Sequence, residues 1–143
     1  MTNPITLNYD VAPVAHQSVR AANGHFYQPT KIGDFKDEII LETRRQLPPG
    51  FKMFTADVPL SVYVEYHFKY LKKEKKSNIG LLIPKITKPD LADNLSKAFI
   101  DALAGIVFEN DAQICTFTAR KFYWESNMIQ AIIRRETWQP TND

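Results

Sequence analysis

The sequence has little of what would tie the protein to a membrane, an oxidising compartment or a zinc site. A single cysteine, Cys115, excludes an internal disulfide and a zinc site built from several cysteines. No apolar run approaches the roughly 20 residues that a membrane-spanning helix needs. Residues 1–10 contain no basic stretch followed by an apolar core, so we expect no secretory signal and a reducing, cytoplasmic setting.

The net charge is also small, at +2 from 18 basic and 16 acidic residues. A basic nucleic-acid-binding domain carries far more, so the total charge alone gives no argument for DNA or RNA. The charges are unevenly distributed, however: seven lysines and one acid lie in residues 69–88, and acids cluster in residues 34–42 and 90–111. The lysine-rich segment is either a solvated loop or a phosphate-binding loop beside a carboxylate site.

What is present is the composition of one globular domain. Hydrophobic residues make up 44% of the 143 residues, and charged residues make up 24%. A chain of this length buries roughly two-thirds of its unfolded surface when it folds, which is enough for a substantial core. Because the sequence has no internal repeat and no low-complexity block, we expect a single domain over residues 1–143.

Hydrophobic periodicity predicts a mixture of strands and helices. Alternation predicts strands at 5–9, 60–70, 112–123 and 128–135, with a further short one at 81–86. Helical spacing predicts helices from residue 34 to about residue 47, and from about residue 90 to residue 104. Residues 10–30 read as a long flexible polar loop, and residues 124–127 have the length of a hairpin connection. We therefore expect an α/β (α+β) fold with helices packed on a small mixed sheet, and Cys115 in its core.

The second predicted helix carries carboxylates on its polar face. At about 100° per residue, Asp90, Asp93 and Lys97 fall opposite the apolar side, and Asp111 follows after a short connection. Hard cations such as Mg²⁺ prefer such oxygen ligands, and bound ions of this kind activate water for phosphodiester hydrolysis. A lysine at the edge of the site would neutralise charge that builds up on the phosphate.

Each of these residues also has an ordinary structural explanation. Asp90 is a good helix N-cap after Pro89, and Asp93 three residues later imitates a capping box. Asp93 and Lys97 have the spacing of a common i, i+4 ion pair, and Asp111 is a plausible turn residue. The spacing alone therefore leaves a metal site and a set of caps and turns both open.

A resemblance to a known family is carried by residues 88–114, KPDLADNLSKAFIDALAGIVFENDAQI. This segment resembles the signature of the RusA-like Holliday junction resolvases of phages, prophages and bacteria. That signature reads approximately K-P-D-x-D-N-L-x-K, then D-A-L-x-G, then an acid followed by D-x-Q and a hydrophobic residue. The matching residues here are Lys88, Pro89, Asp90, Asp93, Asn94, Leu95, Lys97, Asp101, Ala102, Leu103, Gly105, Asp111, Gln113 and Ile114.

The resemblance implies a homodimeric, Mg²⁺-dependent endonuclease, with Mn²⁺ as a substitute, that resolves four-way DNA junctions by paired symmetric nicks. It implies that Asp93 and Asp111 bind the metal, that Asp90 assists them, and that Lys97 contacts the scissile phosphate. The sequence departs from the family pattern at two positions. Two residues, rather than one, separate Asp90 from Asp93, and Asn110 stands where the pattern has an acid.

The resemblance also suggests a role in DNA binding for the lysine-rich segment, because cations beside a carboxylate site attract DNA phosphates that the acids alone would repel. The predicted DNA contacts are Lys85, Lys88, Arg20 and Lys121. A four-way junction has approximate two-fold symmetry, so we expect an isologous dimer, with residues 123–133 as a candidate interface. The expected setting is the cytoplasm of a bacterial host carrying phage or prophage DNA. The alternatives are a junction-binding protein that does not cut and a structural protein whose aspartates are caps.

Overall fold

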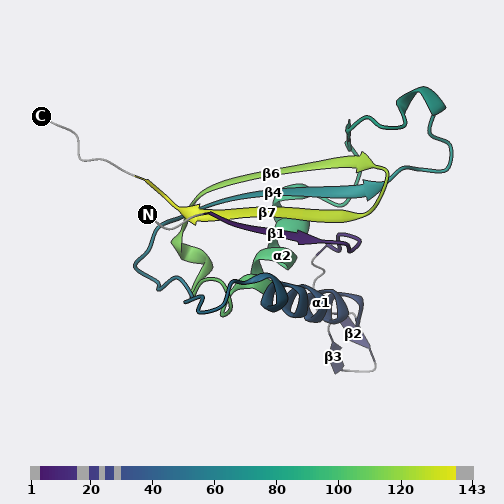
Figure 1. Cartoon of the computed structure of the whole chain (residues 1–143). Helices are drawn as coiled ribbons and strands as arrows, with labels where there is room; N and C mark the ends of the chain where they lie inside the picture. Colours follow the sequence, from purple (N-terminus) through teal and green to yellow (C-terminus); the bar gives the residue numbers. More distant parts are fainter. Residues whose placement is uncertain (1–3, 16–19, 23–24, 28–29, 138–143) are drawn as a thin grey trace, which may run out of the picture.

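A five-stranded sheet with two helices on one of its faces forms the framework of the protein (Figure 1). The computed structural model describes residues 4–15, 20–22, 25–27 and 30–137, without the side chains of residues 20–22, 25–27, 30, 31 and 93. The sheet is mixed, and the predicted α+β single domain is confirmed. No helix in these ranges combines the length and the apolar content needed to cross a membrane.

The described strands and helices agree with most of the predicted elements. Their order along the chain is β1 (Ile5–Tyr9), β2 (Arg20–Ala22), β3 (His25–Tyr27), α1 (Thr30–Gln46), β4 (Leu60–Lys69), β5 (Ile83–Pro84), α2 (Ser96–Leu103), β6 (Ile114–Trp124) and β7 (Met128–Arg135). Helix α1 begins four residues earlier than predicted. The segment predicted as a long loop contains the short antiparallel pair β2–β3, and β5 is shorter than predicted.

The strand order β1-β7-β4-β6-β5 corrects one prediction. Residues 124–127 do not close a hairpin, because β4 lies between β6 and β7, parallel to β6 and antiparallel to β7. The connector passes over the end of β4, where Asn127 Oδ1 accepts a hydrogen bond from Lys69 N (2.8 Å) and Tyr70 N donates to Trp124 O (2.9 Å). Crossing one intervening strand spans roughly 10 Å, which three extended residues can bridge, so connector length does not decide the pairing.

The core lies between the sheet and the two helices, and Phe99 of α2 occupies its centre. Phe99 is fully buried, and its ring packs edge-on against Tyr9 of β1 (5.5 Å between centroids) and Tyr66 of β4 (6.2 Å). The Tyr9 hydroxyl is in turn hydrogen-bonded to Thr43 Oγ1 of α1 (2.7 Å). These contacts fix the position of α2 on the sheet, and with it the position of the segments that flank α2.

The segment predicted as a single helix over residues 90–104 is α-helical only from Ser96 to Leu103. Its first turn, η2 (Leu91–Leu95), is a π-helix, in which Leu95 N donates to Asp90 O (3.1 Å) and Ser96 N donates to Leu91 O. The apolar side of the helix is buried as predicted, and the helix stops just before Gly105, which has a φ of 88°. Glycine adopts this left-handed conformation without a steric cost.

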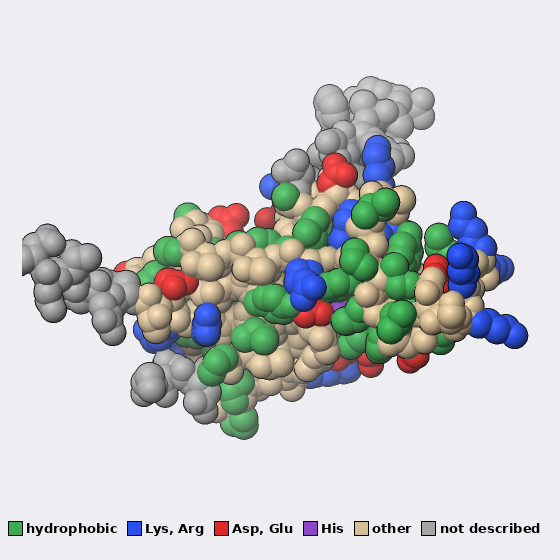
Figure 2. All heavy atoms as spheres, turned by 90° about the horizontal axis from the view of Figure 1, so that it is seen from above, with side chains coloured by type: hydrophobic (Ala, Val, Ile, Leu, Met, Phe, Trp, Pro, Cys, Tyr) green, Lys and Arg blue, Asp and Glu red, His purple; other side chains and the backbone are tan. Residues whose placement is uncertain are grey.

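Neither α1 nor α2 lies on the other face of the sheet (Figure 1). Figure 2 views this face and shows lysine side chains gathered at the end where the loop after β4 projects. Cys115 is exposed rather than buried as predicted, because residues 115–118 of β6 are all exposed and β5 pairs with β6 only at Phe122 and Tyr123.

The packing of Phe99 gives a stability prediction. Replacing Phe99 with Ala leaves a cavity between the sheet and α2, so we expect the free energy of unfolding to fall by about 3–5 kcal/mol in chemical denaturation. The control is Ile86→Ala, because the side chain of Ile86 is 93% exposed and its removal should change stability by less than about 0.5 kcal/mol. Equal effects of the two substitutions would contradict this account of the core.

Candidate active site

A hollow of about 340 Å³ lies where the start of α2 meets η3 (Asp111–Gln113) and β6. Its lining includes Lys97, Asp101 and Asp111, together with the apolar side chains of Ile114 and Phe117. Lys97 and Asp111, which are 14 positions apart in the sequence, therefore line one surface, as the sequence reasoning expected. Asp101 was not among the predicted site residues.

Asp111 is held in place by its neighbours rather than by its own side chain. Asn110 Oδ1 accepts a hydrogen bond from Ala112 N (2.8 Å), and Asn110 N donates to Gln113 Oε1 (2.9 Å). The buried amide of Gln113 also donates to Thr55 O and Val58 O, both at 2.9 Å. Asp111 itself is exposed, and no described residue hydrogen-bonds to its carboxylate. The turn therefore depends on Asn110 and Gln113, which leaves the Asp111 carboxylate available to a ligand.

Asp90 occupies the N-cap position of η2, but its side chain makes no capping hydrogen bond. It is exposed, and its backbone is extended (φ −67°, ψ 136°). The capping explanation that the sequence left open for Asp90 therefore has no support in the described contacts. The carboxylate of Asp93 lies outside the described side chains, so its predicted ion pair with Lys97 and its role as a ligand remain predictions.

The π-helical turn explains how the chain holds two residues, rather than one, between Asp90 and Asp93. A π turn contains one more residue than an α turn, because its hydrogen bonds run from residue i to residue i+5. An extra residue in a regular helix would rotate the preceding residues by about 100° relative to the buried face. The turn η2 has this π geometry, and Leu95, Ala98 and Phe99 after its start are all buried.

The loop before η2 is held by a lysine from β6. Lys121 Nζ donates to Thr87 O (2.7 Å) and to Pro89 O (2.8 Å), the carbonyl immediately before Asp90. Because these are hydrogen bonds from an ammonium group, they are stronger than neutral ones. Lys121 therefore fixes the backbone that presents Lys88 and Asp90, both of which have exposed side chains.

Lys85 supports the same loop from the other side. Its ammonium donates to Thr87 Oγ1 (2.7 Å) and to the Tyr123 hydroxyl (3.1 Å), and it lies 4.7 Å from the centroid of the Tyr123 ring. The hydrogen bonds with Thr87 and Lys85 lower the pKa of the Tyr123 phenol below its usual value. Lys85 and Lys121, both predicted as DNA contacts, thus have side chains engaged within the protein.

The remaining predicted DNA contacts and the neighbouring arginine can also be located. Lys88 is exposed, whereas the side chain of Arg20 lies outside the described part of the structure. Arg120 precedes Lys121 on β6 and lies on the opposite face, and its guanidinium carbon is 4.6 Å from the centroid of the Phe122 ring. The alternation of residues along β6 indicates that Lys121 and Tyr123 lie on the same, helix-facing side of the strand. It does not indicate that Lys121 binds backbone carbonyls or that the Tyr123 hydroxyl binds Lys85.

The charges around the hollow suit a hard cation, although the described side chains do not complete a metal site. Asp111 and Asp90 supply exposed carboxylate oxygens of the type that Mg²⁺ prefers. Asp101 is paired with Lys36 of α1 (3.8 Å), which partly neutralises it. No three His, Cys, Asp or Glu side chains converge among those described, a set to which the side chain of Asp93 does not belong.

Comparisons with known proteins extend the likeness beyond residues 88–114. A family model described as Endodeoxyribonuclease RusA matches residues 8–134, from within β1 to within β7. The chain is also 31% identical over 120 residues to an uncharacterized protein, YqaN, of Bacillus subtilis (strain 168). That alignment covers 82% of this chain and 83% of YqaN.

The contacts of Lys121 give a prediction about the loop that it holds. Replacing Lys121 with Met removes two ammonium hydrogen bonds, so we expect the amides of residues 85–91 to exchange with solvent roughly tenfold faster or more. Amides in β4 should keep their protection in the same hydrogen–deuterium exchange experiment. The control is Lys72→Met in the exposed lysine-rich loop, and an unchanged exchange rate in the Lys121 variant would contradict the assignment.

Proposed function

The chain belongs to the RusA endodeoxyribonuclease family, and from this premise we propose that it is a Mg²⁺-dependent endonuclease that resolves four-way DNA junctions by paired nicks. The observation that carries the proposal is the hollow shared by Lys97 and Asp111, whose lining also includes Ala92, two residues after Asp90. All four residues belong to the segment that resembles the family signature. Mn²⁺ is the expected substitute for Mg²⁺, because both suit oxygen ligands.

We assign Asp93 and Asp111 as metal ligands, with Asp90 as an assisting ligand. Support comes from the exposed carboxylates of Asp90 and Asp111, which no described side chain caps or pairs. A bound divalent ion would activate a water molecule and stabilise the leaving oxygen of a phosphodiester. The protein contributes the positions of the carboxylates: Lys121 holds the backbone before Asp90, and Gln113 holds the turn that contains Asp111.

Lys97 is the proposed partner of the scissile phosphate. Its side chain is exposed and lines the hollow together with Asp111. An ammonium beside the phosphate would neutralise the charge that develops as the phosphodiester is attacked. Asp101 lines the same hollow, but it is paired with Lys36, so we assign it to the support of the site rather than to metal binding.

We propose that DNA reaches the site across the exposed Lys88 and the lysine-rich loop. Lys88 lies two residues before Asp90, so a phosphate that it contacts would be close to the carboxylates. Lys85 and Lys121 add positive charge behind the loop while holding it in place. Arg20 remains a proposed contact at the other end of the chain. Contacts of this kind make DNA affinity fall steeply as the salt concentration rises.

The proposed assembly is an isologous homodimer, because two symmetric nicks need two equivalent sites. Residues 123–133 were the candidate interface, but Ile129, Ala131 and Ile133 are fully buried against the helices. Within β7, the outward-facing side chains such as the exposed Ile132 are the ones that can contribute. The proposed biological setting is recombination or repair of phage or prophage DNA in the bacterial cytoplasm.

A second candidate function is junction binding without cleavage. The observation that favours it is the π-helical turn, because the extra residue changes the path of the backbone between Asp90 and Asp93. If this path prevents the aspartates from converging on one ion, the protein would recognise junctions through its lysines but would not cut them.

Cleavage of a synthetic four-way junction separates these functions. We expect symmetric nicking in Mg²⁺ that EDTA abolishes and that Asp111→Asn lowers by about 100- to 1,000-fold, since metal-assisted charge stabilisation contributes several kcal/mol. The matched control is Asp37→Asn, which changes an exposed carboxylate on α1 and should leave the rate unaltered.

The other outcomes are equally informative. Tight, junction-specific binding without nicking in Mg²⁺ or Mn²⁺ would support the second function and contradict the first. Binding without preference for the junction over linear duplex would contradict both. A cleavage rate that Asp111→Asn and Asp37→Asn lower equally would show that the nicking does not come from the proposed site.

A further inference from the structure

Three consecutive carbonyl groups around Asp90 have hydrogen-bond partners, although the Asp90 carboxylate makes no capping bond. Pro89 O accepts from Lys121 Nζ (2.8 Å), and Asp90 O accepts from the amide at the end of η2 (3.1 Å). Leu91 O accepts from both the N–H and the hydroxyl of Ser96, the latter at 2.9 Å. The backbone that carries Asp90 is therefore fixed on both sides, and Ser96 supplies the contacts on its helical side.

The hydroxyl bond of Ser96 is specific to the wide turn in which it occurs. Serine hydroxyls in α-helices reach the carbonyl three or four residues back, whereas Ser96 reaches the carbonyl of Leu91, five residues back. In an α-helical turn, the amide of Leu95 would bond to the Leu91 carbonyl, and the Ser96 hydroxyl would lose it. The hydroxyl of Ser96 therefore stabilises the π-helical turn against the α-helical alternative.

Tyr66 holds the Ser96 hydroxyl in this orientation. It lies on the central strand β4, is fully buried, and donates its phenolic hydrogen to Ser96 Oγ (3.3 Å). Burial raises the pKa of the Tyr66 phenol above its usual value, so the phenol stays protonated and remains a donor. Because Ser96 Oγ accepts from Tyr66, its own hydrogen is directed to the Leu91 carbonyl. These bonds connect the middle of the sheet to the turn that precedes α2.

We propose that Ser96 and Tyr66 are positioning residues for the metal site, because they hold η2 in the π-helical register from which Asp90 and Asp93 extend. The proposal rests on the metal-binding roles proposed above for the two aspartates. A change to the α-helical register would rotate the residues before the turn by about 100° relative to the buried face of α2. Ser96 lines the hollow, but it acts through the backbone of the turn rather than by contact with metal or DNA.

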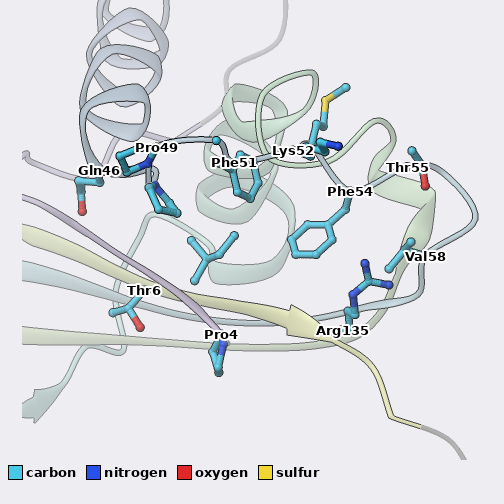
Figure 3. A pocket seen from close by; sticks show the side chains of 14 residues that line it. Pro4, Thr6, Gln46, Pro49, Phe51, Lys52, Phe54, Thr55, Val58 and Arg135 are labelled. Carbon is cyan, nitrogen blue, oxygen red and sulfur yellow. The ribbon is translucent and has the colours of Figure 1, made fainter. Parts of the chain in front are cut away.

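The chain offers a matched control, because the same pattern of bonds occurs away from the candidate site. Thr43 of α1 is fully buried, its hydroxyl donates to Ile39 O (2.6 Å), and it is hydrogen-bonded to the Tyr9 hydroxyl (2.7 Å). Thr43 lies three residues before Gln46, which lines a cavity of about 650 Å³ at the end of α1 (Figure 3). That cavity shares no lining residue with the hollow of the candidate site. Thr43→Val therefore removes an equivalent buried hydroxyl without touching the proposed site.

The first measurement is the affinity of the DNA-free protein for Mn²⁺, read from the electron paramagnetic resonance signal of unbound Mn²⁺. We expect Ser96→Ala to weaken Mn²⁺ binding by about 10- to 100-fold, the usual effect of removing a group that orients a metal ligand. Ser96→Thr keeps a hydroxyl and should restore the affinity to within about threefold. Tyr66→Phe keeps the ring against Phe99 and should weaken binding by a smaller factor than Ser96→Ala. Thr43→Val should leave the affinity unchanged.

The second measurement tests the turn itself without metal. In protein kept metal-free with EDTA, the amides of residues 95 and 96 should exchange with solvent roughly tenfold faster in Ser96→Ala, because the turn loses a hydrogen bond. Amide exchange followed by nuclear magnetic resonance gives this rate for each residue. In Thr43→Val, the same two amides should exchange as they do in the unaltered protein.

The outcomes separate this proposal from the proposed function. If the unaltered protein binds no Mn²⁺, or if Asp111→Asn does not weaken the binding, the proposed metal site fails and the positioning role fails with it. If the binding depends on Asp111 but Ser96→Ala matches the unaltered protein, only the positioning role is overturned. Equal weakening by Ser96→Ala and Thr43→Val, or no recovery in Ser96→Thr, would also overturn it, because the effect would then not come from the Ser96 hydroxyl.

Discussion

The packing of Phe99 between Tyr9 and Tyr66 is the contact on which the arrangement of the candidate active site depends. It fixes α2 over the central strands, and the chain carries predicted site residues immediately before α2, on its first turn and shortly after it. Two further groups then set the local geometry: Lys121 holds the carbonyls before Asp90, and Gln113 holds the turn that contains Asp111. The carboxylates can therefore be exposed without being loosely positioned, because their backbones are fixed by residues that are not themselves proposed ligands.

The uneven distribution of lysines and acids along the chain is consistent with a carboxylate site that binds DNA. A site made of carboxylates repels DNA until a cation is bound, so a protein of this kind needs basic residues nearby without being strongly basic overall. The net charge of +2 is the sum of these opposed parts. Lys85 and Lys121 show that some of the basic residues also have structural partners, so a lysine beside an acidic site cannot be assigned to DNA from the sequence alone. Asp101 lines the hollow but is paired with Lys36, so an acid near the site cannot be assigned as a metal ligand from the sequence alone either.

Sequence periodicity predicted the strands and helices whose burial is regular. It failed where contacts between distant parts of the chain determine the strand order or the local geometry. In the sequence of strand β4, the residues of the face packed against the helices alternate with more polar ones, so its bounds were predicted to within one residue. The neighbour of β7 could not be predicted, since a short connector permits β4 to lie between β6 and β7. Cys115 is exposed because residues 115–118 of β6 are uncovered, and the turn before α2 is π-helical; neither feature is visible in the hydrophobic pattern. The proposed site residues within 88–114 were predicted from a resemblance to a family signature. The supporting role of Lys121 could be found only from its hydrogen bonds in the structure.

The central claim is that the loop ending in Asp90, the π-helical turn and η3 together bring carboxylates to one divalent metal site. The most direct measurement is a crystal structure of the protein grown with Mn²⁺, with the anomalous signal used to locate the ion. We expect a strong anomalous peak in the hollow, within bonding distance of the Asp93 and Asp111 carboxylates and beside Lys97. A peak at another part of the molecule, or none at a Mn²⁺ concentration that supports junction cleavage, would contradict it.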